Sequence, residues 1–554
     1  MGRRGISLVG VLALAFCVAA VLALLLPLAV LILQSVSAPG SGLTVDHYVS
    51  YFATPGLLRA LENTALLGIA TVAFVVPLAF SFAYGMERAV LPGKEGLSFI
   101  AAAPLLVPSL LPAMVLIYLF GHQGLLAPML QGADIYGFPG VLAAEVIATL
   151  PHAVIILKTA LRTADARLYE QATLLGAGSW RKFYTITLPS ARHGLISAVL
   201  VVFALTITDI GAPKVIGGGF DVLAITIYKQ VLGQQNFQLG SVAAILLMVP
   251  SAFAIVLERA AAKRHTASLS ARARSLVPRP HPVRDRLAAV VCYGTAVLVL
   301  VMLTVCQLVA LVRLWPYDLS LTLDYYDFGR YDGSGWGAVI NSTLLAAISA
   351  LVGTAFVFAG AHLSERTKEA PWLRGLFSRL ALLPAAIPGL ALGLSYVLFF
   401  DSPLNPLHVL YGSVGLLLIA NITHYYTVPH LSAVGAVKAI DGELEAVAQS
   451  LGRSPLSVLG MVVAPMSVSV LVEIALYFFV NAMTTVSVVM FLYPPGFKLA
   501  SVAVLNMDDA GDLAPAAAMG MMIFYVNFVV RIAGQAVLAS GRRLVRHRMK
   551  TAVA

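Results

Sequence analysis

The sequence predicts an all-α integral membrane protein of about 12 transmembrane helices, arranged as two homologous six-helix repeats. Of the 554 residues, 59% are hydrophobic and only 11% are charged, whereas charged residues make up about 25% of an average soluble domain. The hydrophobic residues gather in runs of about 20 residues, the length that a helix needs to cross a bilayer. Several motifs also occur twice at a nearly constant spacing. These observations exclude an ordinary soluble globule.

Hydrophobic runs of spanning length occur in both halves of the chain. In the first half we expect spans near residues 6–33, 63–84, 98–120, 137–161, 194–210 and 240–257. In the second half we expect them near residues 287–311, 338–361, 376–400, 409–433, 466–492 and 513–538. The first run begins like a signal peptide, but it continues to Leu33 without a convincing cleavage site, so we expect an uncleaved span.

Residues 258–286 separate the two predicted repeats, which comprise residues 1–257 and 287–554. This segment is basic, contains prolines and has few large apolar residues, so we expect a cytoplasmic linker. Its Lys and Arg residues could contact nucleic acid. The preference of basic residues for the cytoplasmic side, with contact to anionic lipid, explains them better, and we predict no nucleic-acid partner. With both termini in the cytoplasm, most of the 36 Lys and Arg residues fall on the cytoplasmic side.

The repeats are predicted by pairs of motifs at matching positions. Each pair lies 278 to 280 residues apart: Asn63 and Asn341, Pro104 and Pro384, Pro108 and Pro388, Pro151 and Pro429. Equal spacing at unrelated motifs is typical of a parallel repeat produced by gene duplication. Two prolines four residues apart break or kink a helix, which a membrane protein tolerates where other protein groups or water satisfy the freed carbonyls. We therefore expect the third span of each repeat to face the protein interior.

The most informative duplicated segment is a polar stretch at residues 168–189, repeated at residues 444–465. In each copy a short helical segment ends at a glycine, Gly176 or Gly452, and an amphipathic segment then leads to a proline, Pro189 or Pro465. Glycine allows a left-handed turn, and proline favours the first turn of the next helix. A surface helix that merely joins two spans is the alternative, but a spaced duplicate favours a functional element.

The first copy resembles the cytoplasmic EAA loop of ABC importer permeases, the element that docks into a cleft on the separate ATPase subunit. In that pattern a Glu and two Ala begin six residues before the Gly. The first copy has Glu170, Gln171 and Ala172 there and departs only at the middle position. The second copy has Ala446, Val447 and Ala448, with Glu445 one residue earlier. The resemblance therefore implies these ATPase-coupling residues: Glu170, Gln171, Ala172, Gly176, Glu445, Ala446, Ala448 and Gly452.

The resemblance covers nearly the whole chain and implies a fused permease in which both repeats form the channel of a bacterial importer. We expect it in the inner membrane, with two copies of an ATPase inside, a solute-binding protein outside and a small-molecule substrate. The sequence has no G-x-x-x-x-G-K-[ST] segment to hold nucleotide phosphates. We therefore expect no enzymatic activity and no bound cofactor in this chain, with ATP used by the partner subunit.

Placing a polar or charged side chain inside a membrane span costs free energy, so such residues usually have a structural or functional role. Glu145 and Glu473 lie within predicted spans, and Asp209 ends the fifth span of the first repeat. Asp209 and Thr485 each follow by twenty residues the proline that opens their span. They are candidates for a translocation path, with the structural capping or bridging of helices as the alternative. The candidate path residues are Asp209, Asn481, Thr484 and Thr485. The cysteines have no metal-ligand spacing, so we predict no metal site.

Segments 208–240 and 482–522 are similar to permeases assigned to 2-aminoethylphosphonate, in a group whose other fused members carry ferric iron or thiamine. The resemblance therefore implies 2-aminoethylphosphonate as cargo, with ferric iron or thiamine as alternatives. A rival of another class is a proton-coupled secondary transporter with Glu145, Asp209 and Glu473 as its proton relay. Such a transporter has no need for a duplicated cytoplasmic loop that turns at a glycine.

Overall fold

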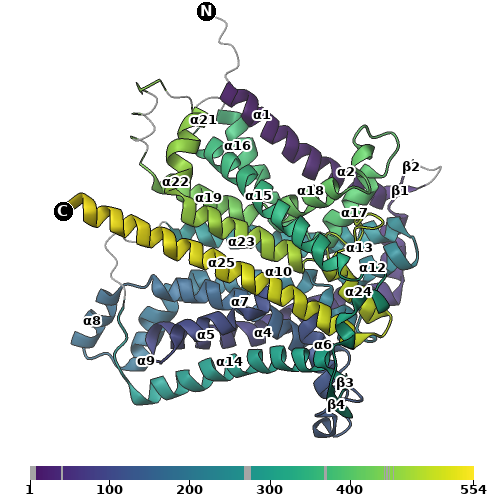
Figure 1. Ribbon diagram of the computed structural model, residues 1–554, viewed down its shortest axis with the longest axis horizontal. Coiled ribbons are helices and arrows are strands. Elements are labelled where there is room, and N and C mark those ends of the chain that lie inside the picture. Colours follow the sequence, from purple (N-terminus) through teal and green to yellow (C-terminus); the bar gives the residue numbers. More distant parts are fainter. Residues whose placement is uncertain are drawn as a thin grey trace, which may run out of the picture. The chain divides into compact units, whose positions relative to one another are not determined.

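The computed structural model describes the backbone of residues 8–38, 42–266, 276–366, 371–441, 443, 447, 450–452 and 455–553. Most of these residues are helical (Figure 1). The strands among them form two short antiparallel hairpins, β1 (Ser37–Ala38) with β2 (Gly42–Leu43) and β3 (Val312–Leu314) with β4 (Asp318–Leu321). The predicted all-α membrane fold is therefore confirmed.

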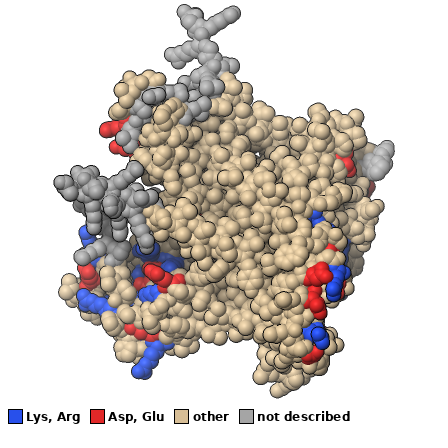
Figure 2. Space-filling view, viewed as in Figure 1, with Lys and Arg blue, Asp and Glu red and all other residues tan. Residues whose placement is uncertain are grey.

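Within the described residues, 8 helices are long and apolar enough to cross a membrane. Two bent helix pairs and two shorter apolar helices occupy the remaining predicted spans. The long helices are α1–η1–α2 (Leu8–Ala20, Val21–Leu25, Leu26–Val36), α4 (Pro55–Arg88), α7 (Phe138–Arg162), α9–η4–α10 (Ser179–Lys182, Phe183–Thr187, Leu188–Thr208), α13 (Phe237–Thr266), α14 (Pro282–Leu311), α15 (Gly337–Arg366) and α25 (Leu513–Val553). On the face in Figure 2, charged side chains gather toward the two ends of the helices, with an uncharged band between them.

The third span of each repeat is broken at its proline pair. In the first repeat α5 (Lys94–Ala101) and the 3-10 turn η2 (Ala103–Leu106) precede α6 (Leu110–Phe120). In the second, α16 (Pro371–Leu380) and η8 (Leu383–Ala386) precede α17 (Gly389–Phe400), and the two parts are bent by 111°. The first seven residues of α6 and the first eight of α17 are buried. The prediction that these spans face the interior is confirmed.

Two predicted spans of the second repeat differ from the structure. Residues 409–433 form two helices, α18 (Val414–His424) and α19 (Thr427–Ala439). The predicted span 466–492 is wrong at its outer end, because α23 (Val468–Thr484) stops eight residues earlier. The next residue, Thr485, has an extended backbone with a φ of −68° and a ψ of 137°. Hydrophobicity continues past this point, but the helix does not.

By their contacts the helices divide into two compact units that do not coincide with the two sequence repeats. One unit comprises Ser35–Tyr326 and Met507–Met521, and the other comprises Met1–Gln34, Asp327–Asn506 and Met522–Ala554. The first span of the chain therefore packs with second-repeat helices, where the Phe16 ring stacks on Phe356 at 4.4 Å. Helix α14 conversely packs on the first repeat, with Cys292 Sγ 3.6 Å from Phe82 O. The boundaries at residues 257 and 287 remain a prediction about the repeats.

The same local contacts recur in both units after the fifth span. In one unit the Asn63 side chain donates to Asp221 O at 2.9 Å, and the Thr64 hydroxyl oxygen accepts from Leu223 N at 2.8 Å. In the other, Asn341 donates to Lys498 O at 3.2 Å, and the Ser342 hydroxyl oxygen accepts from Ala500 N at 2.7 Å. These hydroxyl groups satisfy free N–H groups at the starts of α12 (Leu223–Tyr228) and α24 (Ala500–Asp509). The second span thus positions the short helix that follows the fifth span in each unit.

Candidate functional site

The first EAA-like segment is a helix with both of its ends satisfied. Helix α8 (Ala166–Leu174) begins after Asp165, whose carboxylate accepts from Arg167 N at 3.1 Å. At its end Ala177 N donates to Ala172 O at 2.8 Å, and Gly176 adopts a φ of 72°. This is the Schellman arrangement, in which a left-handed residue lets the chain leave the helix. Gly176 is therefore required by backbone conformation, as the sequence predicts.

The turn after α8 exposes large apolar side chains. Leu174 is 89% exposed, Leu175 is 85% exposed and Trp180 is 75% exposed. Glu170 and Gln171 are exposed beside them, and Ala172 is half-buried. Exposed apolar residues that lie together, rimmed by polar groups, indicate a surface that another protein covers. We call Leu174, Leu175, Trp180 and Glu170 the coupling surface.

The coupling surface is anchored to the membrane helices by its inner side. The Tyr169 hydroxyl group pairs with the Thr187 hydroxyl group at 2.9 Å, and the Arg88 guanidinium group lies over the Tyr169 ring at 5.3 Å. Arg88 also donates to Leu161 O at 2.7 Å. Since α9, η4 and α10 follow each other without a break, the segment after the turn continues directly into a membrane-spanning helix.

The second copy has the same turn. Gly452 has a φ of 75°, Leu451 before it is exposed, and a π-helical turn η10 (Leu459–Val463) occupies the place that η4 has in the first copy. The predicted coupling residues Glu445, Ala446 and Ala448 lie outside the described residues. The structure therefore places the turn of the second copy, and the roles assigned to the residues of both copies remain predictions.

Asp209 lies at a break between two helices. It follows α10, and its carboxylate accepts from the N–H group of Ala212 at 2.9 Å, in the first turn of α11 (Gly211–Ile216). Its other oxygen accepts from the Ser109 hydroxyl group at 2.6 Å, directly before α6. A Cβ atom at Gly211 would lie 2.2 Å from Ser109 Oγ, so the two segments touch closely. This geometry supports the capping alternative for Asp209.

Glu145 of α7 reaches the same junction. Its side chain is buried, and its carboxyl group interacts electrostatically with that of Asp209. Its Oε1 atom has no hydrogen-bond partner among the described residues. Two neighbouring carboxylates repel each other when both are ionised. Ser109 and this pairing are what the sequence analysis missed, because no local pattern relates residues of three different spans.

The other candidate path residues lie together at the end of α23, in the other unit. The Asn481 side chain donates to Tyr477 O at 2.8 Å, and Thr485 N donates to Asn481 O at 2.9 Å. The Thr485 carbonyl accepts from the Ser501 hydroxyl group at 2.5 Å. These are bonds to the backbone within one unit. A shared path with Asp209 therefore remains a prediction.

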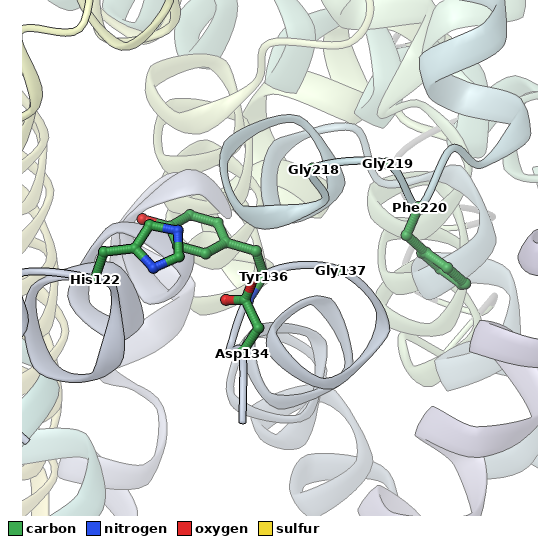
Figure 3. A pocket seen from close by; sticks show the side chains of 7 residues that line it. All are labelled: His122, Asp134, Tyr136, Gly137, Gly218, Gly219 and Phe220. Carbon is green, nitrogen blue, oxygen red and sulfur yellow. The ribbon is translucent and has the colours of Figure 1, made fainter. Parts of the chain in front are cut away.

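A shallow surface pocket of about 470 Å³ lies beside the start of α7 (Figure 3). The His122 and Tyr136 rings face each other with centroids 5.0 Å apart, and the Asp134 carboxylate accepts from Tyr136 N at 3.0 Å. Gly218 and Gly219 line the opposite side. In the predicted orientation this pocket opens on the outer face of the membrane.

Comparison with known proteins agrees with this architecture. Residues 76–266 match the family described as "Binding-protein-dependent transport system inner membrane component". The ferric transport system permease protein FbpB of Actinobacillus pleuropneumoniae is 25% identical over 86% of this chain and 70% of its own length. That match extends over both repeats. The chain is thus similar to ABC importer permeases, over most of its length to a ferric transport permease and over residues 76–266 to the family of inner membrane components. The molybdenum transport system permease protein ModB of Escherichia coli is 30% identical over 26% of this chain and 63% of its own length.

The chain is thus a multi-pass membrane protein, and the family that residues 76–266 match is an inner membrane component. The predicted resemblance to importer permeases is therefore supported over both halves of the chain. The ATPase and solute-binding partners belong to the proposed function.

Proposed function

We propose that the coupling surface around α8 and its counterpart at Gly452 are the docking sites for two copies of the ATPase. The observation that carries this proposal is the exposure of Leu174, Leu175 and Trp180 beside Glu170, in a segment continuous with α10. Closure of the ATPase pair would move the docked segment. Helix α10 would transmit that movement to the junction of Asp209 with Ser109, and so bias the channel between its inward-open and outward-open states.

We propose 2-aminoethylphosphonate as the cargo. The support is the similarity of segments 208–240 and 482–522 to permeases assigned to this compound. A zwitterionic phosphonate suits a path with donors and acids, although Lys229 is paired with Asp221 at 2.7 Å. Ferric iron is the second candidate, because FbpB, a ferric transport permease, matches most of the chain.

Uptake measurements distinguish the two cargoes. The permease is expressed with its neighbouring ATPase and binding protein in cells that lack their own uptake of the tested compound. We expect uptake of radiolabelled 2-aminoethylphosphonate that unlabelled ferric citrate does not inhibit. Uptake of ferric iron alone would replace the first cargo by the second. Failure of any ATPase to co-purify with the permease would contradict the docking proposal itself.

We also propose that both termini lie in the cytoplasm, from the distribution of Lys and Arg residues. A cysteine placed at Ser334 should react with an impermeant maleimide in intact cells. A cysteine at Ser268, which lies outside the described residues, should react only after the cells are opened. The native cysteines Cys17, Cys292 and Cys306 are buried, so they add little background. The opposite pattern would reverse the orientation.

A further inference from the structure

We propose that Lys214, Tyr228 and Asp509 form an outer latch, which ties the tip of the second repeat to the first and opens during the transport cycle. The inference rests on the proposed importer function. It concerns the end of α24, the start of α25 and the turn between them, residues Met507–Met521, which pack with first-repeat elements in one unit. We call these residues the tip.

The latch consists of three side chains from three elements. Lys214 Nζ of α11 lies 2.6 Å from Asp509 Oδ1 at the end of α24. The Tyr228 hydroxyl group of α12 donates to Asp509 Oδ2 at 3.1 Å. The Lys214 ammonium group also lies over the Tyr228 ring, 4.7 Å from its centroid, which adds a cation–π contact. Both oxygens of Asp509 are thus held by the first repeat.

The stability of α24 does not explain why two aspartates lie at its end. Asp508 and Asp509 are the last two residues of α24, where the helix dipole disfavours negative charge. Partners in the first repeat must offset this effect, and Lys214 is the cation that does so. The Lys214 and Asp509 side chains are 21% and 38% exposed. A partly exposed pair of this kind is weak enough to open and close, since such pairs contribute about 0–1 kcal/mol.

The course of the chain explains why the latch must open. Residues Asp327–Asn506 and Met522–Ala554, on either side of the tip, belong to the other unit. Movement of one unit relative to the other must therefore bend α24 and α25 beside the tip or release contacts made by the tip. Bending a helix sacrifices backbone hydrogen bonds, whereas the latch is a single ion pair with one hydroxyl contact. The latch is the weaker element.

Asp508 makes the latch sensitive to pH. Burial, together with the nearby Asp509 carboxylate and against the opposing effect of Lys214, raises its pKa to about 7. Among the described residues, Tyr118 of α6 also faces Asp508. Below pH 7, Asp508 is neutral and Lys214 balances Asp509 alone. Above pH 7, one ammonium group faces two carboxylates. The folded state thus holds an extra proton between about pH 4 and pH 7, so stability falls as the pH rises through this window.

Charge reversal tests the latch on the intact complex of permease and ATPase. Lys214→Asp and Asp509→Lys should each raise the basal ATPase rate, measured without binding protein, by about threefold or more. Each substitution removes the Lys214–Asp509 ion pair that stabilises the resting state. The double variant restores the pair and should return the rate to that of the wild type. Lys229→Asp is the matched control, since it breaks the exposed pair with Asp221 within the first repeat, and it should leave the rate unchanged.

Covalent locking tests whether opening is required. Cysteines at positions 214 and 509, joined by a short bismaleimide, should reduce uptake at least about tenfold, and the same cysteines without cross-linker should not. Undiminished uptake by the cross-linked permease, or unchanged basal rates in both charge-reversal variants, would overturn the latch. Absence of the ATPase from the purified complex would instead count against the importer function, so the two failures are distinguishable.

Asp508→Asn tests the pH dependence of the latch, because asparagine has the same shape as aspartate but stays neutral. Its melting temperature in detergent should equal that of the wild type near pH 5 and exceed it by a few degrees at pH 8. A constant difference across this range would remove Asp508 from the latch.

Discussion

Gly176→Val is expected to abolish uptake without lowering the amount of permease in the membrane. Gly176 has a φ of 72° and no atom lies within 4 Å of the position that a Cβ would take. The substitution therefore acts through the backbone alone. A β-branched residue in this conformation costs about 1–3 kcal/mol, which shifts the equilibrium between docking and non-docking turns about fivefold to 160-fold. Uptake should fall by a similar factor, together with ATPase co-purification.

Gly178→Val is the matched control. Gly178 lies two residues further on and is equally open, but its φ of −68° and ψ of 168° suit any residue. It should retain uptake near that of the wild type. Gly176→Asn should retain an intermediate rate, because Asn tolerates the left-handed region better than Val does. Normal uptake in Gly176→Val, or its loss only because the protein fails to accumulate, would remove the coupling role of this turn.

Asp209→Ala is expected to destabilise the permease strongly. The substitution leaves the Ser109 hydroxyl group and the Ala212 N–H group without their acceptor in a partly buried junction. An unpaired buried donor costs about 1–3 kcal/mol. Thermal unfolding in detergent should shift down by several degrees, and less purified protein should be recovered. Asp209→Asn keeps one acceptor oxygen and should lose less.

The same variant separates the two roles that the sequence leaves open for Asp209. Asn481→Ala removes a bond within its own helix and serves as the comparison, with an expected change within about 1 kcal/mol. A stable Asp209→Ala protein that no longer transports would assign Asp209 to the translocation path and contradict the capping role. Loss of stability with transport retained in proportion to the folded protein would support the cap.

Local properties of the chain were enough to predict several features of the permease. Hydrophobic runs predicted the membrane helices, because a helix in lipid must satisfy its backbone internally and bury about 20 apolar residues. The pairs Pro104 with Pro108 and Pro384 with Pro388 predicted the broken interior spans, since proline removes a donor wherever it lies. Gly176 and Gly452 were recognisable as turns from their neighbours alone. Hydrophobicity failed at residues 485–492, where the helix ends before the apolar run ends.

Only the tertiary structure decided which helices meet. The first span packs with second-repeat helices and α14 packs with the first repeat, and an apolar helix carries no local signal for its partner. Ser109, Glu145 and Asp209 come from three spans, and Lys214 and Asp509 lie almost 300 residues apart. Side-chain periodicity reports which face of a helix is apolar. It does not report the neighbour, because van der Waals packing and hydrogen bonds between helices choose among faces that are equally apolar.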